Sequence, residues 1–386
     1  MKKSIFFLLL FSLSILTNAQ YYKAQLHCHS TNSDGFVSPT EVVAAYKSFG
    51  YDILCITDHN YVTDMSSFSD SSFLCFDGEE LTSDVHMNGL FLDSTIDVSG
   101  LSHQDMIDAV LAQGGLVTLN HYLRSSNIIS DSEMVVLQDY HFLEIFNLGC
   151  DAAYPDDQQL WDNMLSRKRR VFGIATDDMH NPIAGQINGG WVMIRLDSFN
   201  LSAIYTALEQ GDFYSSTGVE INTLEFSDNT LHVSCSNCDT IVFYGENHTI
   251  LKKVAADSAS YTMQDEMYVR AFMYNDTISG TEYIRAWTQA FYNPYYGNPL
   301  FSEGEAFFSL YPNPANDIIK IVFDESFILA NNNCTINIFN AEARLLYNKE
   351  YKTTKSISID ISSFSTGMYY LEVVADKSAS VKFFIN

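Results

Sequence analysis

The stretch LHCHSTNSDGFVSPTEVVAAYKSFGYDILCITDH, residues 26–59, contains one complete β/α unit. Residues 38–41, Ser-Pro-Thr-Glu, form a capping box with proline at the first helical position, and Gly50 ends the helix. The apolar run over residues 52–57 then predicts a strand that ends just before His59. A strand that follows a capped helix in this way is typical of parallel β/α folds.

The same pattern recurs further along the chain. Helices are expected over about residues 102–113, 157–168 and 201–210, with apolar strand-like runs between them. Beyond Gly218 the helical period disappears and short alternating runs predict antiparallel strands. The sequence therefore predicts a signal peptide over 1–19, an α/β domain over 20–217, a small antiparallel β domain over 218–292, a linker over 293–304 and a β-rich segment over 305–386.

Composition and the N-terminus restrict the class of protein. The 386 residues include 21 Lys and Arg against 47 Asp and Glu, a net charge of −26, which makes nucleic acid an unexpected partner. The start has Lys2 and Lys3, an apolar run over 5–16 and small residues before Gln20, as in a signal peptide. We expect an exported protein with no membrane-spanning segment after processing.

Seven cysteines leave at least one thiol unpaired. Cys235 and Cys238 form a Cys-x-x-Cys motif, for which a disulfide or simple packing is favoured over a zinc site, because only His232 lies nearby as a further ligand. The remaining candidates Cys28, Cys55 and Cys75 lie in apolar runs and are expected to be buried free thiols.

Polar residues that bind metals follow one apolar run after another. In a parallel β/α fold the ends of the strands meet at one face, so residues that are far apart in sequence become neighbours. Positions two apart in an extended segment point to the same side, so His27 with His29, and Asp178 with His180, can each present two ligands. Six of the ten histidines lie at or just after such strand ends, at positions 27, 29, 59, 86, 121 and 180. Any single motif can arise by chance or serve as a cap or turn, but their repetition predicts a metal site.

These motifs resemble the polymerase and histidinol phosphatase (PHP) superfamily of metal-dependent hydrolases. The matching elements are His-x-His with Ser-Asp-Gly, Thr-Asp-His, Gly-x-Glu, Gly-or-Val-His-x-Asn, Asn-His and Asp-x-His, in the family's order over about residues 22–217. The resemblance implies a distorted barrel of about seven β/α units that binds three divalent metal ions. Zinc, manganese or iron suits such a histidine-rich ligand set.

The resemblance also implies a role for each matching residue. His27, His29, Glu80 and Asp178 would hold the first metal, and Glu80 would bridge to a second metal held with His86 and His121. Asp34, His59 and His180 would hold the third. Asp178, His180 and His29 are expected to be the catalytic residues. Two points stay open: Glu79 competes with Glu80 for the bridging role, and His86 occupies a position that varies in the family.

Two further resemblances concern the rest of the chain. Residues 190–193, 211–218 and 286–288 are similar to a PHP branch that includes a carbamate-ester (carbaryl) hydrolase and carries a small β-sandwich-like domain after the barrel. Residues 311–315, Tyr-Pro-Asn-Pro-Ala, and the strand-like run 367–371 resemble the β-sandwich sorting domain of type IX secretion. An immunoglobulin-like binding module is the alternative for this C-terminal segment. The sorting domain implies export by the type IX machinery to the cell surface or the medium.

Phosphoester hydrolysis fits the predicted site best, because clustered cations attract an anion and generate a nucleophile from water. The substrate would be a small phosphorylated or esterified molecule. Arg124 is a candidate contact for a substrate anion, with a surface role as the alternative. Residues 144–147 end another strand and are candidates for hydrogen bonds to the ligands or for packing. A carboxyl or carbamate esterase and a non-catalytic metal-binding or glycan-binding protein are the remaining alternatives.

Overall fold

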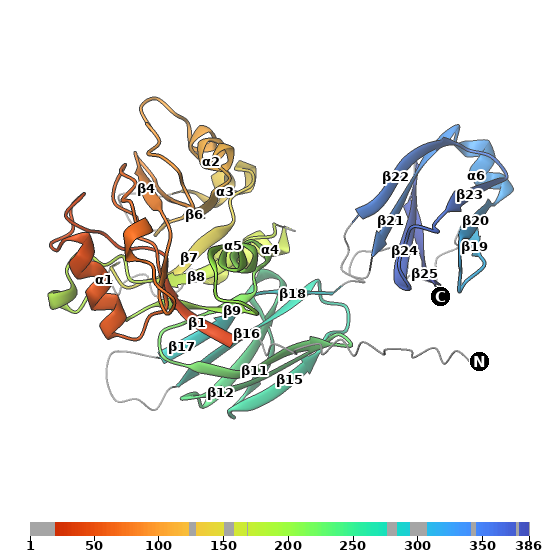
Figure 1. Cartoon of the computed structure of the whole chain (residues 1–386). Coiled ribbons are helices and arrows are strands. Elements are labelled where there is room, and N and C mark those ends of the chain that lie inside the picture. Colours follow the sequence, from red (N-terminus) through yellow and green to blue (C-terminus); the bar gives the residue numbers. More distant parts are fainter. Residues whose placement is uncertain are drawn as a thin grey trace, which may run out of the picture. The chain divides into compact units, whose positions relative to one another are not determined.

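The chain forms two compact units in a computed structural model (Figure 1). The first comprises Met1–Met263 and Tyr268–Phe291, and the second comprises Gln264–Met267 and Tyr292–Asn386. The structure describes residues 20–122, 129–149, 158–167, 169–275, 284–293, 307–340, 345–375 and 378–385. The predicted signal peptide, Arg124 and most of the predicted linker therefore lie outside the described residues.

The helices of the first unit begin and end close to the predicted positions. Ser38 caps α1 through the expected capping box with Glu41, and Ser102 forms a second box with Asp105 at the start of α2. Gly50 has a φ of 73°, a conformation that glycine adopts without strain, directly after α1. The helical elements are α1 (Pro39–Ser48), η1 (Ser66–Phe68), α2 (His103–Ala112), α3 (Asp131–Val136), α4 (Gln158–Ser166), η2 (Pro182–Ala184), α5 (Leu201–Gln210) and η3 (Glu246–His248).

Two open sheets carry the strands of the N-terminal part. One contains β3 (Leu74–Cys75), β2 (Ile53–Leu54), β1 (Gln20–Gln25), β9 (Trp191–Leu196) and β10 (Phe213–Ser216), in that order. The other contains β4 (Gly78–Thr82), β5 (His86–Leu90), β6 (Leu116–Leu119), β7 (Phe142–Asn147) and β8 (Phe172–Thr176). The pairs β1–β2, β2–β3, β6–β7 and β7–β8 are parallel, and the others are antiparallel.

The mixed α/β class is confirmed, but the closed barrel of seven β/α units is not. Among the described residues the strands form two separate hydrogen-bonded sheets, connected by isolated bridges at Cys28–Met179 and His59–Glu80. The sheets nevertheless share one apolar core, which includes Ala24 of the first sheet and Leu116 and Ile174 of the second. Burial of that shared core brings the two sets of strand ends together without closing the hydrogen-bonded ladder.

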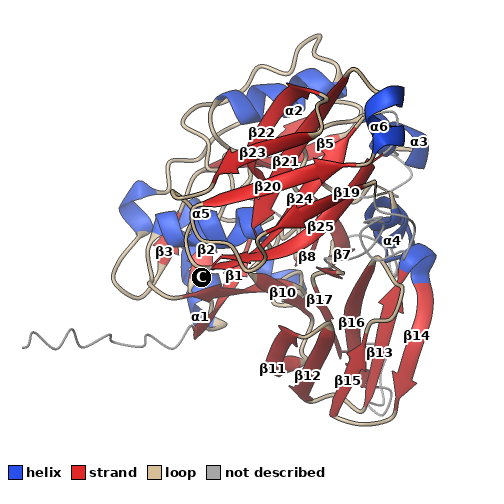
Figure 2. Cartoon of the chain, turned by 90° about the vertical axis from the view of Figure 1, so that its right-hand side faces the viewer, coloured by secondary structure: helices blue, strands red, loops and turns tan. Residues whose placement is uncertain are grey.

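The antiparallel β region continues the first sheet without a break. Strand β10 pairs with β17 (Ile284–Thr288), and the sheet goes on through β16 (Tyr268–Asn275), β13 (Thr240–Gly245) and β14 (Thr249–Val254). A second sheet of β11 (Glu220–Ser227), β12 (Thr230–Ser236) and β15 (Ser258–Thr262) shares an apolar core with it, and the segment ends at β18 (Phe291–Tyr292). Figure 2 shows that the region from β11 to β17 consists almost wholly of strands.

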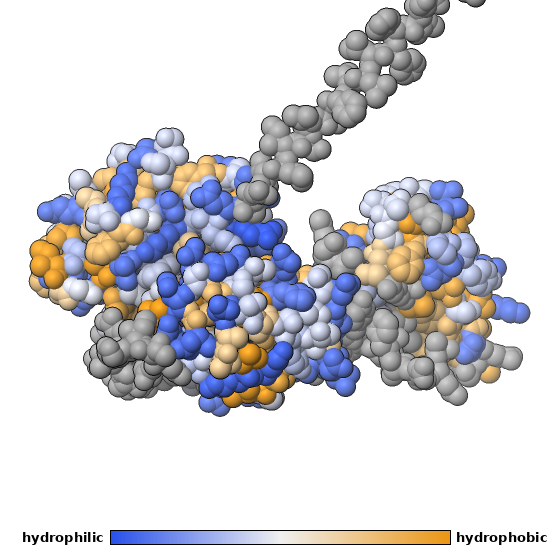
Figure 3. Space-filling view, turned by 90° about the horizontal axis from the view of Figure 1, so that it is seen from below, coloured by the Kyte–Doolittle hydropathy of each residue, from blue (hydrophilic) through white to orange (hydrophobic). Residues whose placement is uncertain are grey.

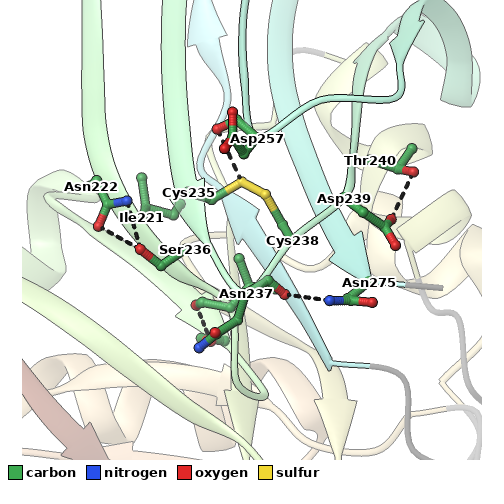
Figure 4. The surroundings of a disulfide bond; sticks show 12 residues. Ile221, Asn222, Cys235, Ser236, Asn237, Cys238, Asp239, Thr240, Asp257 and Asn275 are labelled. Atoms are coloured by element: carbon green, nitrogen blue, oxygen red, sulfur yellow. Dashed lines mark hydrogen bonds between the residues drawn. A yellow bond between two sulfur atoms is a disulfide. The ribbon is translucent and has the colours of Figure 1, made fainter. Parts of the chain in front are cut away.

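The Cys-x-x-Cys motif forms a disulfide in this region. Cys235 at the end of β12 is bonded to Cys238 just before β13, so the bond closes the turn between the two strands (Figure 4). The Cys235 sulfur also lies 3.7 Å from the carbonyl oxygen of Asp257. Cys28, Cys55 and Cys75 are buried free thiols, as expected, and so is Cys334.

A fully buried ion pair connects helix α4 to strand β16. The Arg270 guanidinium donates two hydrogen bonds to the Asp162 carboxylate, at 2.7 and 2.5 Å, and both side chains are inaccessible to solvent. Tyr268 and His248 lie 2.9 and 2.6 Å from the same carboxylate. The guanidinium also lies over the Trp161 ring, at 4.7 Å. The pair is therefore satisfied on all sides, and loss of one partner would leave a buried charge.

Arg270→Met is accordingly expected to lower the free energy of unfolding by about 3 kcal/mol, since it leaves Asp162 without its counter-charge. Arg195→Met is the matched control, because Arg195 is exposed on β9, and its effect should stay within about 0.5 kcal/mol. Denaturant unfolding of both variants gives the comparison. Equal stability of the two variants would show that the buried pair contributes nothing specific.

The second unit contains two antiparallel sheets around a core of its own. One sheet has β19 (Phe308–Tyr311), β20 (Ile318–Phe323) and β23 (Ser356–Asp360), and α6 (Glu325–Ala330) follows β20. The other has β22 (Leu345–Lys352), β21 (Asn333–Asn340), β24 (Gly367–Val374) and β25 (Ser378–Ile385). Inward-facing residues of both sheets, such as Ile321 and Leu371, are buried in one cluster. Two packed sheets are the arrangement of a β-sandwich.

The described helices are too short or too polar to cross a membrane.

Candidate metal centre

The ends of strands from both sheets supply the predicted ligands. His27 and His29 follow β1, His59 follows β2, and Glu80 lies within β4. His86 begins β5, His121 follows β6, and Asp178 and His180 follow β8, whereas Asp34 lies in the loop between β1 and α1. The structure brings all nine together in four overlapping groups, each with its ligand atoms within 4.8 Å of one another. The groups are His27/His29/Asp178, His27/Glu80/His121, His59/Glu80/His86 and His29/Asp34/His59/His180.

The buried part of the cluster has ligand atoms at the spacing that a metal ion requires. The Nε2 atoms of His27 and His29 lie 3.3 Å apart, and Asp178 Oδ1 lies 3.3 and 3.1 Å from them. Glu80 Oε2 lies 3.5 and 3.4 Å from the same two nitrogens. Ligand atoms about 2.0–2.1 Å from a tetrahedrally coordinated zinc lie about 3.3–3.4 Å from one another. The three atoms of His27, His29 and Asp178 therefore have the mutual distances of ligands to one metal ion, and Glu80 Oε2 lies at a similar distance from both histidines.

Glu80, and not Glu79, faces the histidines. Glu80 Oε1 lies 2.9 Å from His86 Nδ1 and 3.2 Å from His121 Nε2, while its other oxygen faces His27 and His29. Glu79 points to the other side of β4, because successive side chains in a strand alternate, and it accepts a hydrogen bond from the Ile96 amide at 2.7 Å. Burial raises the Glu79 pKa to about 7, although the Ile96 amide works against this shift.

The open part of the cluster is centred on Asp34. Its Oδ1 lies 3.4 Å from His180 Nε2, 3.6 Å from His59 Nε2 and 3.8 Å from His29 Nδ1. The Asp34, His59 and His180 side chains are 56%, 24% and 27% exposed, whereas Glu80 is 1% exposed. The centre is therefore buried around Glu80, which we call its base, and accessible to solvent around Asp34, His59 and His180.

Two buried polar atoms show that the side chains alone do not complete the centre. Within the described part of the chain, Glu80 Oε2 and His29 Nδ1 are buried and make no hydrogen bond of good geometry, although His59 Nδ1 lies 3.0 Å from Glu80 Oε2 and Asp34 Oδ1 lies 3.8 Å from His29 Nδ1. Such unsatisfied groups cost free energy unless an ion, a water molecule or another group pairs with them. Six imidazoles and three carboxylates that converge in this way fit divalent cations such as zinc, manganese or iron.

The electrostatic field at the base of the centre favours positive charge. Burial favours the neutral form of His27, yet the carboxylates of Glu144, Asp178 and Glu80 raise its pKa well above the usual value. Burial likewise works against ionisation of Glu80, but the charge of His27 and the hydrogen bonds from His121 and His27 hold the Glu80 pKa well below its usual range. The negative potential that keeps a proton on the buried His27 ring would also stabilise a bound cation.

Glu144 of β7 is hydrogen-bonded to the ligand shell. Its Oε1 lies 2.6 Å from His27 Nδ1 and accepts from the Thr176 hydroxyl at 2.7 Å, and its Oε2 accepts from the His121 amide at 2.8 Å. The sequence left a packing role open for this residue, but the carboxylate is buried and holds the His27 ring and the His121 backbone. Through the bond to Nδ1, Glu144 determines which His27 nitrogen faces the centre.

Asp58 and Asp177 position the loops, and neither was among the predicted site residues. Asp58 accepts from the Ser30 amide and from the Ser33 and Thr63 hydroxyls, at 2.6–2.7 Å, so it connects the loop that carries Asp34 to the loop after β2. Asp177 accepts hydrogen bonds of 2.8–2.9 Å from three consecutive amides of the loop before β9. Both are buried next to predicted ligands, and that adjacency is the only sequence signal they give.

Two residues of the centre have a strained backbone. His121 has a φ of 23° and Asp178 a φ of 50°, values that residues other than glycine rarely adopt. Such conformations persist only where the surrounding contacts impose them, and they are concentrated at functional sites. Here Asp178 is held by its amide, which donates to the His27 carbonyl at 3.0 Å.

Two family models match the chain. The PHP domain matches residues 25–76, which include His27, His29, Asp34 and His59, and the secretion system C-terminal sorting domain matches residues 309–386. A comparison with curated proteins finds no match. The narrower resemblance to the carbaryl-hydrolase branch is not shown by these matches and stays a prediction.

The chain also matches solved structures from several organisms. A two-domain protein from Bacteroides vulgatus, containing a predicted PHP-like metal-dependent phosphoesterase, is 16% identical; the alignment covers 70% of this chain and 95% of that one, with a TM-score of 0.43. An amidohydrolase from Chromobacterium violaceum with bound sulfate is 15% identical, with 41% and 88% coverage and a TM-score of 0.33. A lesion-specific endonuclease from Pyrococcus furiosus is 15% identical, with 49% and 56% coverage and a TM-score of 0.37.

The sorting domain indicates type IX secretion to the cell surface or the extracellular space, as the sequence predicted. The N-terminal match includes four of the nine side chains that meet in the centre. The chain therefore contains a PHP domain and a secretion system C-terminal sorting domain.

Proposed function

We propose that the protein is a secreted metal-dependent hydrolase, and specifically a phosphoesterase that works with three divalent ions. The observation that carries this proposal is the convergence of nine metal-binding side chains in four overlapping groups, with His27, His29 and Asp178 at the mutual spacing of ligands to one ion and the buried Glu80 carboxylate beside them. Buried carboxylate and imidazole groups that converge without well-formed hydrogen bonds for all their polar atoms are typical of a site that a further group completes.

The distances support the following assignment of ligands. His27, His29, Glu80 and Asp178 would hold the first ion. Glu80 would also hold the second ion, with His121 and His86, whose rings are 5.0 Å apart. Asp34, His59 and His180 would hold the third, on the open side. The ligand atoms of His86 fall into one group with those of His59 and Glu80, so His86 could also contribute to the third site.

Bound divalent ions would supply a nucleophile by lowering the pKa of water and would neutralise charge on the phosphoryl oxygens. The protein provides the framework for this chemistry. Glu144 orients His27, and the Asn120 amide donates to Glu80 at 2.9 Å, so the buried ligands are held in place before substrate arrives. Asp34 lies on the exposed side, where a substrate would enter. Asp178, His180 and His29 are the residues we expect to be essential for turnover.

The charge of the centre favours a phosphoester over a neutral substrate. Six positive charges from three divalent ions would outweigh the three carboxylates Asp34, Glu80 and Asp178, so the loaded centre would be positive within an otherwise acidic protein. A carboxyl or carbamate esterase on the same centre remains the second candidate, because residues 190–193 and 211–218 resemble the carbaryl-hydrolase branch.

Hydrolysis of p-nitrophenyl phosphate and of p-nitrophenyl acetate by the metal-loaded protein distinguishes the two candidates. We expect turnover of the phosphate ester to exceed turnover of the acetate, and expect both to disappear after chelation and return with added metal. Turnover of the acetate alone would replace the phosphoesterase by an esterase. Turnover of either ester that survives complete chelation would contradict metal-dependent hydrolysis.

Glu144→Gln tests the supporting role of the carboxylate behind His27. We expect metal affinity to fall about 10- to 100-fold, because the partner that fixes the ring is lost while its volume stays the same. Titration against a competing chelator measures this. Glu133→Gln is the matched control, since Glu133 also pairs with a histidine, His103, outside the cluster. Unchanged affinity in Glu144→Gln would reduce the residue to a packing role.

A further inference from the structure

The loops that carry the partly exposed ligands of the metal centre also carry exposed apolar side chains. Phe36 is 72% exposed, Tyr61 is 49% exposed and Ile183 is 89% exposed. Each lies two or three positions after one of the partly exposed residues Asp34, His59 and His180. We call these three side chains the apolar rim.

Backbone and side-chain contacts hold the three loops of the apolar rim beside one another. The Phe36 amide donates to the His180 carbonyl at 2.8 Å, which joins the loop after β1 to the loop after β8. The Asn32 side-chain amide donates to the Thr63 hydroxyl at 2.9 Å, which joins the loop after β1 to the loop after β2. Figure 3 shows apolar side chains gathered at the end of the first unit at which α1 lies in Figure 1.

Single exposed apolar residues are common on protein surfaces, but here one lies on each of three adjoining loops that carry an exposed ligand. Loops that serve only to carry charged and imidazole ligands have no need for large hydrophobic side chains in water. We propose that the apolar rim binds the organic part of the substrate, so that the preferred phosphoester has a bulky apolar alcohol group. This inference rests on the proposed function, because it places the phosphate of the same molecule on the metal centre.

The expected preference follows from the hydrophobic effect. Full burial of one methylene group increases affinity about fourfold. A rim that covers one side of an alkyl group should give about half of that free energy, which corresponds to about twofold in affinity for each methylene. Hexylphosphonate has five more methylenes than methylphosphonate and should therefore bind about 30-fold more tightly. Phosphonates cannot be hydrolysed at the P–C bond, so calorimetric titration of the metal-loaded full chain measures binding without turnover.

The variant Phe36→Ser/Ile183→Ser removes two side chains of the rim without touching a proposed ligand. We expect the 30-fold preference to shrink to about threefold, while methylphosphonate affinity stays within about twofold. Ile250→Ser is the matched control, because Ile250 is 57% exposed on β14 and lies outside the three loops. This control should keep the full dependence on chain length.

The outcomes separate the rim from the proposed hydrolysis. Equal affinity for methylphosphonate and hexylphosphonate in the unsubstituted protein would overturn the apolar rim, and so would a preference that survives in the double variant. Either of these results, together with hydrolysis of ethyl phosphate, would leave the phosphoesterase proposal intact. Chain-length-dependent binding without hydrolysis of ethyl or hexyl phosphate would instead overturn the phosphoesterase and support the rim as a binding surface.

Discussion

His29→Ala and Asp178→Asn are each expected to abolish hydrolysis while the protein still folds. His29 Nε2 lies within 3.1–3.4 Å of Asp178, His27 and Glu80, so its removal takes away one corner of the proposed first metal site. Asp178→Asn keeps the shape of the side chain and removes its negative charge. We expect kcat/KM to fall by about three orders of magnitude or more in each variant, because the chemistry depends on the ions that these residues hold.

Matched controls show whether the effect belongs to the centre. His103→Ala removes a histidine that pairs with Asp84 at 3.0 Å, outside the cluster, and Asp70→Asn removes an exposed partner of Lys47. Both should keep activity within about twofold. Circular dichroism and thermal unfolding check the fold of all four variants. Full activity in either His29→Ala or Asp178→Asn would refute the catalytic assignment.

Removal of residues 305–386 is expected to stop the protein from reaching the cell surface. This segment contains the sorting-domain match and has a separate hydrophobic core, which includes Ile321 and Leu371. In a host with type IX secretion, immunoblots of cell fractions should find the full chain at the surface or in the medium, and the shortened chain inside the cell envelope.

The purified shortened chain should keep its hydrolytic activity within about twofold, since the metal centre lies in the first unit. A shortened chain that reaches the surface in normal amounts would show that the segment is not the sorting signal. Lost activity with an intact fold of the first unit would instead give the C-terminal segment a role in the reaction.

Local signals and the positions of the ligands could be predicted from the sequence. The Ser38–Glu41 capping box started α1 as expected, because the reciprocal hydrogen bonds depend only on residues three apart. The nine predicted ligands meet because strand ends from both sheets converge on one core. The choice between Glu79 and Glu80 followed from the pairing of β4 with β5, which sets the side of the strand that faces the histidines.

Strand pairing and supporting contacts could not be predicted in the same way. Apolar runs indicate which segments are buried, but they do not determine that β9 and β10 pair antiparallel with one another and that β10 then pairs with β17. The roles of Glu144, Asp58 and Asp177 depend on partners 23 to 117 positions away or on loop amides, and spacing alone does not identify such partners.

Anomalous X-ray diffraction from crystals of the metal-loaded full chain tests the central claim most directly. The proposed centre predicts one anomalous peak about 2.0–2.3 Å from the ligand atoms of His27, His29, Glu80 and Asp178, with further peaks beside His121 and Asp34. Peaks only at other places, or no peak at saturating zinc, manganese or iron, would contradict the metal centre and the hydrolase proposal that depends on it.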